Sequence, residues 1–289
     1  MGGKGQDLRC LFCGPVIGSL SVVSEGFRGR LATVHAGARR RPLVGTVISL
    51  PDAGLAELTA SAADFVWIDL EHGALSGRDV QPLAIAARAG GAASLVRLRA
   101  FDDVALGPAL DAGVDGVVAP RIERVEEAER LVERLRYPPH GSRGLAARRA
   151  SAYEGAARDP VCVVQLESRA AVERAEAIAR VEGVDALVVG CSDLALDMGE
   201  ELAQGWPRCR DAVAHVTGVC SAAGLASGVA GPDDPGLLLE LAGAESSLLV
   251  LGADVRIYAR AIRRSFAPLG DGATELHSAT RPKEAHVRT

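Results

Sequence analysis

Charged side chains follow several short aliphatic segments of the sequence. Asp69 and His72 come after the segment FVWI, Arg97 ends SLVR, Glu167 follows VCVVQL, and Asp193 follows ALVVGCS. Charged groups at the ends of apolar segments are costly unless they are paired or bound to a metal. Carboxylates are the ligands that a hard divalent ion prefers, and such an ion keeps part of its water. If these segments meet in space, the sequence predicts a divalent-metal site with a histidine and an arginine beside it.

Each of these residues also has a purely structural interpretation. Glu167 could be a rim carboxylate that pairs with a nearby arginine, and Asp193 could cap the helix expected to follow it. Asp69 and His72 could form a structural hydrogen-bonded pair. Taken together, however, two carboxylates, a histidine and an arginine on one rim would contribute little to stability. This combination favours a functional site.

The positions of these residues depend on a regular alternation of short apolar segments and amphipathic stretches. The apolar segments are four to eight residues long, rich in Val, Leu and Ile, and bounded by Gly, Asp or Pro, which is typical of buried parallel strands. We expect eight strands, at residues 43–50, 65–70, 94–98, 116–120, 161–167, 186–190, 225–230 and 247–252. We expect helices at residues 52–62, 77–89, 102–112, 123–136, 169–180, 209–223, 233–242 and 255–266.

Eight alternating strands and helices predict an α/β protein with a single (β/α)8 barrel. A doubly wound open sheet is the rival fold, but no G-x-G-x-x-G turn follows the first predicted strand. The predicted barrel domain spans residues 27–268, between an N-terminal extension, 1–26, and a disordered C-terminal tail, 269–289. Because the active sites of such barrels lie at the carboxyl ends of the strands, the charged side chains should converge at one mouth.

Composition excludes several classes of protein. The net charge of -5, with acidic and basic residues interspersed, argues against a nucleic-acid-binding protein. No apolar segment reaches the ~20 residues that span a bilayer, and the N-terminal segment lacks the features of a signal peptide. The six cysteines do not form the dense pattern of a disulfide-rich secreted domain, and the single C-x-x-C at Cys10 and Cys13 lacks the second pair of a zinc site. We expect a soluble, cytoplasmic protein.

Several motifs, in order, resemble those of one enzyme family. Residues 68–73 read IDLEHG, residues 136–144 RYPPHGSRG, residues 164–169 VQLESR, and residues 189–199 VGCSDLALDMG. Over residues 43–266 the chain resembles the HpcH/HpaI aldolase family, the class II pyruvate aldolases that act on 2-keto-3-deoxy sugar acids and 4-hydroxy-2-oxo-diacids. Cys191 departs from the family pattern, which has proline at this position.

The resemblance implies a metal and substrate site. Glu167 and Asp193 would bind a divalent ion, Mg²⁺ or Mn²⁺ with Co²⁺ as a third choice, and water and the 2-keto acid would supply the other ligands. Gln165 would support the bound keto acid. The amides of Ser192 and Asp193, at the start of a helix, would suit its carboxylate.

The resemblance also implies the catalytic residues. Arg97 would stabilise the enolate oxygen, and His72, oriented by Asp69, would move protons through a metal-bound water. A Schiff-base aldolase would instead need a lysine in the barrel. The sequence has no lysine between Lys4 and Lys283, which argues against that mechanism independently.

We therefore expect a metal-dependent carbon–carbon lyase that cleaves or forms a 4-hydroxy-2-oxo acid from a small 2-keto acid and an aldehyde. One alternative is a citrate-synthase-like condensation of oxaloacetate with acetyl-CoA on the same site. A second alternative is an inactive barrel that binds a keto acid or serves in assembly. The resemblance also implies a homo-oligomer, a hexamer or a trimer.

Overall fold

The computed structural model describes residues 26–37, 41–145, 159–201 and 206–279. The remaining residues include most of the predicted N-terminal extension, with Cys10 and Cys13, and the end of the predicted tail; these predictions lie outside the described residues.

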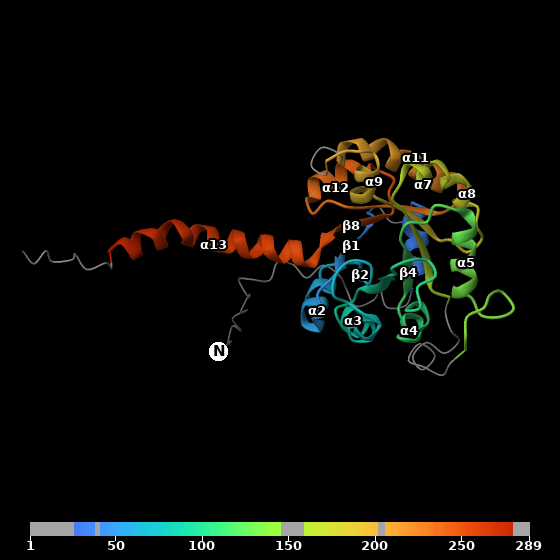
Figure 1. Ribbon diagram of the computed structural model, residues 1–289, viewed down its shortest axis with the longest axis horizontal. Coiled ribbons are helices and arrows are strands. Elements are labelled where there is room, and N and C mark those ends of the chain that lie inside the picture. Colours follow the sequence, from blue (N-terminus) through green and yellow to red (C-terminus); the bar gives the residue numbers. More distant parts are fainter. Residues whose placement is uncertain (1–25, 38–40, 146–158, 202–205, 280–289) are drawn as a thin grey trace, which may run out of the picture.

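Eight parallel strands close into a barrel in the order of the sequence, which confirms the predicted (β/α)8 fold (Figure 1). Every predicted apolar segment is a strand, to within a few residues at each end. The strands are β1 (Leu43–Ile48), β2 (Phe65–Asp69), β3 (Ala93–Arg97), β4 (Gly116–Ala119), β5 (Val161–Leu166), β6 (Ala186–Gly190), β7 (Ala226–Ala230) and β8 (Leu248–Ala253).

Helices connect the strands, and most of them lie near the predicted segments. They are α2 (Ala53–Ala60), α3 (Gly77–Ala89), α4 (Leu106–Asp111), α5 (Val125–Leu135), α7 (Arg169–Glu173), α8 (Ala175–Ala179), α11 (Cys209–Ala223) and α12 (Pro235–Ala242). The predicted helix at 169–180 is interrupted at Arg174, where α7 ends and α8 begins. The helix expected after Asp193 is present as α9 (Cys191–Asp197), but it begins at Cys191, before Asp193. A 3-10 turn, η2 (Trp206–Arg208), was not predicted.

A further helix, α1 (Phe27–His35), lies across the amino-terminal end of the barrel. Phe27 and Leu31 are buried, and the Phe27 ring centroid lies 5.7 Å from that of Phe65, the first residue of β2. Arg28 forms an ion pair with Asp185, immediately before β6. The sequence did not predict α1, because two apolar residues four positions apart are too weak a periodic signal. The helix closes this end of the barrel and leaves the opposite mouth for the site.

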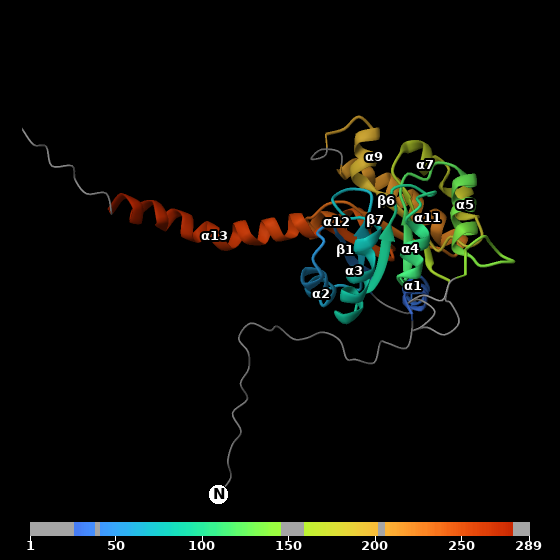
Figure 2. The same cartoon turned by 60° about the horizontal axis from the view of Figure 1, so that its bottom comes forward.

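The C-terminal helix, α13 (Asp254–Ala279), leaves the barrel and projects away from it (Figures 1 and 2). It continues well past the predicted end at residue 266, so residues 269–279 of the predicted disordered tail are helical. Proline and glycine disfavour a helix interior, yet Pro268 and the glycines after it lie within α13. The Ala- and Leu-containing sequence on both sides has high helix propensity and carries the helix across them. Among the described helices, none combines the length and the apolar character that crossing a membrane would require.

Candidate active site at the carboxyl end of the barrel

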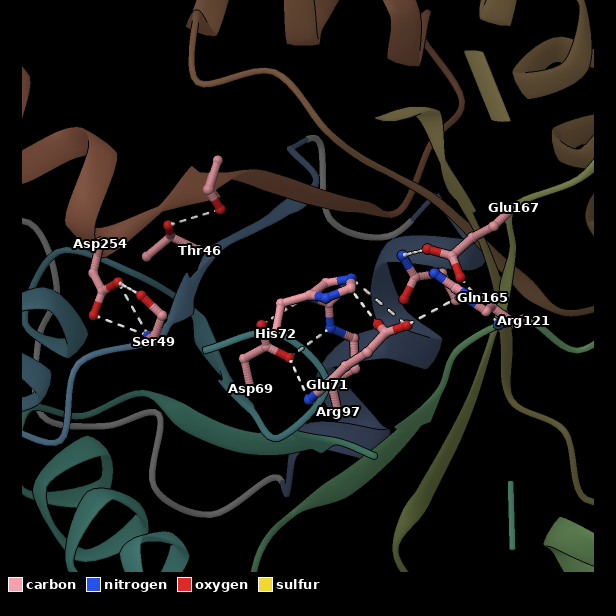
Figure 3. Close-up of polar contacts among 11 residues, drawn as sticks. Thr46, Ser49, Asp69, Glu71, His72, Arg97, Arg121, Gln165, Glu167 and Asp254 are labelled. Carbon is pink, nitrogen blue, oxygen red and sulfur yellow. Dashed lines mark hydrogen bonds and ion pairs between the residues drawn. The ribbon is translucent and has the colours of Figure 1, made fainter. Parts of the chain in front are cut away.

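Most of the predicted site residues meet at the carboxyl end of the barrel; Figure 3 shows Asp69, His72, Arg97, Gln165 and Glu167. Asp69 and Arg97 are the last residues of β2 and β3, Glu167 follows β5 directly, and Asp193 lies in α9 just after β6. The structure adds two residues that the sequence analysis did not select, Glu71 and Arg121.

Arg97 and Asp69 form a buried, two-pronged ion pair. Arg97 Nε and Nη2 donate to the two Asp69 carboxylate oxygens at 2.9 and 2.8 Å. The pairing follows from the strand register, which places Asp69 of β2 beside Arg97 of β3. Burial opposes the charge of Arg97, but Asp69 and the neighbouring carboxylates Glu71 and Glu167 outweigh it and raise its pKa.

The predicted pairing of Asp69 with His72 is wrong in this structure. Both Asp69 oxygens are engaged by Arg97, and Oδ1 also accepts from the Glu71 amide at 3.0 Å. His72 Nε2 instead lies 3.7 Å from Glu71 Oε1, and its side chain is half exposed. His72 therefore lies at the mouth, as predicted, with Glu71 as its carboxylate neighbour.

The carboxylate of Glu71 is buried and lies near two arginines and a histidine. Its oxygens lie 3.2 Å from Arg97 Nη1 and 3.4 Å from Arg121 Nε. Burial nevertheless outweighs these charges and raises the pKa of Glu71. The sequence signal that could have identified it is its place in the segment Asp69–His72, between two residues that were selected.

Glu167 is buried and held by two donors. Gln165 Nε2 donates to Oε1 at 2.7 Å, and the Arg121 amide donates to Oε2 at 3.0 Å. Burial, together with the negative charges of Glu71 and Asp193, raises the pKa of Glu167 to about 8, against the opposing effect of Arg97. Among the described residues no arginine side chain forms an ion pair with Glu167, so the interpretation of this residue as a simple rim ion pair is not supported.

Gly190, the last residue of β6, makes room for Glu167 and Gln165. A β-carbon at this position would lie 2.7 Å from Gln165 Nε2 and from Glu167 Oε1. Real β-carbons essentially never approach other atoms so closely. A side chain at position 190 would therefore displace Gln165 of β5 and Glu167, which follows β5.

Asp193 completes the predicted pair of carboxylates. It lies in the first turn of α9, whose N-cap residue is Gly190, so the alternative role of Asp193 as the helix cap is wrong. Its side chain is about one-third exposed, and Oδ1 lies 3.8 Å from Arg121 Nη2. Ser192 precedes it in the same turn, at the position predicted for a substrate-binding amide.

A family model described as HpcH/HpaI aldolase/citrate lyase matches residues 50–241. The chain belongs to this family. It is 30% identical over 259 residues to a hydroxypyruvate/pyruvate aldolase from Cupriavidus necator, covering 86% of this chain and 96% of that one.

Two solved structures are similar to this chain over most of its length. A family protein from Burkholderia cenocepacia is 30% identical, with a TM-score of 0.74 over 83% of this chain and 98% of that chain. The citrate synthase SbnG is 26% identical, with a TM-score of 0.73 over 84% of this chain and 99% of that chain.

The residues of this HpcH/HpaI chain fit a divalent ion bound by two protein carboxylates. Asp193 lies near enough to Glu167 for its charge to raise the pKa of that residue. Two further buried acceptors, Gln165 Oε1 and Glu71 Oε2, accept no hydrogen bond in the described part of the chain. Within the described residues, no three His, Cys, Asp or Glu side chains are grouped closely enough to bind a metal by themselves. An ion here would therefore need oxygen ligands from water or substrate, as hard divalent ions accept.

Proposed function

We propose that the chain is a divalent-metal-dependent aldolase that forms and cleaves 4-hydroxy-2-oxo acids through a pyruvate-type enolate. The observation that carries this proposal is the position of Glu167 at the barrel mouth, where its carboxylate interacts with both Asp193 and the buried guanidinium of Arg97. The pyruvate and hydroxypyruvate aldolases that the chain resembles over most of its length support it.

Glu167 and Asp193 would hold Mg²⁺, Mn²⁺ or Co²⁺, and an ion bound there would act as a Lewis acid on the keto acid's carbonyl. Arg97 would stabilise the oxygen that gains negative charge, because its guanidinium is fixed in place and buried. Asp69 would hold Arg97 in that orientation.

Gln165 would contact the keto acid from β5, and the amides of Ser192 and Asp193 would bind its carboxylate. His72 would transfer protons at the mouth, since its side chain reaches both solvent and Glu71.

A second candidate function uses the same site to condense oxaloacetate with acetyl-CoA. The similarity of the chain to the citrate synthase SbnG supports this second function. An assay with Mn²⁺ separates the two. The proposal expects pyruvate to be consumed when glycolaldehyde is added, and Glu167→Ala to abolish this. Consumption of oxaloacetate that depends on acetyl-CoA would support the synthase instead. Binding of a keto acid without either reaction would indicate an inactive barrel.

We also propose that the chain forms a homo-oligomer through α13. Val255, Tyr258, Ile262 and Phe266 are spaced three or four residues apart, so they form one stripe along the helix. Each of these four side chains is exposed, between 39% and 65%. An apolar stripe on a helix that projects into solvent is expected to bury itself against a partner.

A further inference from the structure

Arg121 has an unusual backbone conformation at the site. It follows Pro120 after β4, and its φ of 53° lies in the left-handed region, the one such non-glycine residue in the described part of the chain. This conformation points its amide toward Glu167 Oε2 at 3.0 Å. Non-glycine residues in this region are strained, and they cluster at functional sites. A glycine would orient the amide with less strain, so the backbone contact alone does not account for an arginine here.

The Arg121 side chain differs from that of the other arginine at the mouth. The Arg97 side chain is 10% exposed, and its Nε and Nη2 donate hydrogen bonds to Asp69 at 2.9 and 2.8 Å. The Arg121 side chain is 61% exposed, and its guanidinium nitrogens lie 3.4 Å from Glu71 and 3.8 Å from Asp193. These are ion pairs at long range, and among the described contacts the guanidinium donates no hydrogen bond. Its donors therefore remain available to a ligand.

The position of Arg121 places its guanidinium where the aldehyde, the second reactant, would enter the site. Its contacts reach Glu71 after β2, Glu167 after β5 and Asp193 after β6, so its guanidinium lies across the mouth. Because it is more exposed than Arg97, Glu167 and Gln165, it lies on the solvent side of the groups that would hold the keto acid. An aldehyde approaching the enolate from solvent would pass beside it.

We propose that Arg121 selects acceptor aldehydes that carry a carboxylate. A guanidinium presents paired N–H donors that match the two oxygens of a carboxylate. Glu71 and Asp193 hold this guanidinium at the mouth, although their charges reduce its attraction for an anion. The inference rests on the proposed aldolase function. In the selected reaction, C3 of pyruvate loses a proton and bonds to the aldehyde carbon, whose oxygen gains a proton.

Two aldehydes of two carbons each test this selection with pyruvate and Mn²⁺: glyoxylate, which is anionic, and glycolaldehyde, which is neutral. The measure is the ratio of their kcat/KM values. Because the aldehydes differ in intrinsic reactivity, the change of this ratio on mutation is decisive. Charged hydrogen bonds typically contribute enough to change the ratio by about 10- to 100-fold. We expect Arg121→Gln to lower the ratio by this factor and Arg121→Lys to lower it less.

The ratio also separates selection from a structural role. Gln has the same β-carbon as Arg, so the backbone strain at position 121 is retained. Any general damage to the metal or keto-acid site affects both aldehydes and cancels in the ratio. Arg169→Gln is a matched control, since Arg169 begins α7 after β5, is 67% exposed and pairs with Asp197. We expect it to keep the wild-type ratio.

An unchanged ratio in Arg121→Gln, with equal losses for both aldehydes, would overturn the inference and leave Arg121 a structural residue. Failure of the proposed function gives a different result. In that case the wild-type protein would not exchange the methyl protons of pyruvate with solvent, with either aldehyde present or absent.

Discussion

At the scale of single residues, the partner of Asp69 differs from the predicted one. Asp69 was expected to orient His72, but it contacts Arg97 instead. Asp69 precedes His72 by three positions, but its carboxylate accepts two hydrogen bonds from Arg97. A carboxylate that fixes a guanidinium holds the group that would stabilise developing charge on the substrate. We therefore propose that Asp69 acts on the reaction through Arg97.

A double-mutant cycle tests this task. We expect Asp69→Asn and Arg97→Lys each to slow pyruvate proton exchange by about 100-fold, and the double variant to be little slower than either, because the two residues act as one unit. Exchange followed by NMR provides the rates, and urea unfolding checks that each variant folds. If the effect of Asp69→Asn were coupled to His72→Asn rather than to Arg97→Lys, this assignment would be wrong.

Glu167 predicts a pH dependence of stability in the metal-free protein. Its pKa is raised to about 8, first by burial and then by Glu71 and Asp193. Below about pH 4.5 both folded and unfolded chains hold the proton. Between 4.5 and 8 the unfolded chain releases it and the folded chain keeps it, so the free energy of unfolding falls as pH rises. Above pH 8 this loss is complete.

In EDTA, we expect Glu167→Gln to be more stable at pH 9 relative to wild type than it is at pH 5. The difference should amount to about 1.4 kcal/mol for each unit by which the pKa is raised. Urea unfolding at the two pH values measures it. A gap that stays constant between pH 5 and pH 9 would show that Glu167 is not held with a raised pKa.

The sequence was sufficient to place Asp69, Arg97, Glu167 and Asp193 at one mouth, because parallel strands in a barrel end on the same side. It was not sufficient to predict their partners. The pairing of Asp69 with Arg97 depends on the register of β2 and β3, and that register is set by long-range packing. Arg121 was not selected, although it directly follows the predicted strand 116–120; its left-handed backbone angle could not be read from the sequence.

At the scale of elements, the packing of the Gln165 and Glu167 side chains against the end of β6 depends on Gly190. We expect Gly190→Ala to weaken Mn²⁺ binding by at least about 10-fold, because the new β-carbon would displace Glu167 and Gln165. Gly218→Ala in α11 is the control, since a β-carbon there meets nothing within 4 Å and alanine favours the helix by about 1 kcal/mol. Electron paramagnetic resonance of free Mn²⁺ measures both affinities. Equal affinities in the two variants would contradict this account of Gly190.

The strands were predictable because fully buried parallel strands are short and continuously apolar, as in residues 161–166, all of which are buried. The helix α1 and the full length of α13, which lie outside the strand–helix repeat, were not predictable from local sequence. α1 depends on packing into the barrel end, where Phe27 meets Phe65, and no local pattern encodes that contact. α13 is longer than the predicted helix at 255–266. It continues through Pro268, although a proline usually marks a helix end.

At the scale of the whole molecule, the exposed stripe of α13 predicts self-association. We expect the wild-type protein to be a dimer or larger by light scattering, and Ile262→Arg combined with Phe266→Arg to shift it toward monomer. Leu239→Arg is the control, because Leu239 is 59% exposed and belongs to a different helix, α12. A monomeric wild-type protein, or an equal effect of the control, would refute a role of α13 in assembly.

The whole account depends on one chemical claim, that the barrel mouth removes a proton from a bound 2-keto acid. Incubation with Mn²⁺ and pyruvate in D₂O, without an aldehyde, tests it most directly, because exchange of the methyl protons reports enolate formation alone. The account predicts exchange that is abolished by EDTA and by Glu167→Ala. Absence of exchange in the wild-type protein with both pyruvate and oxaloacetate would contradict it.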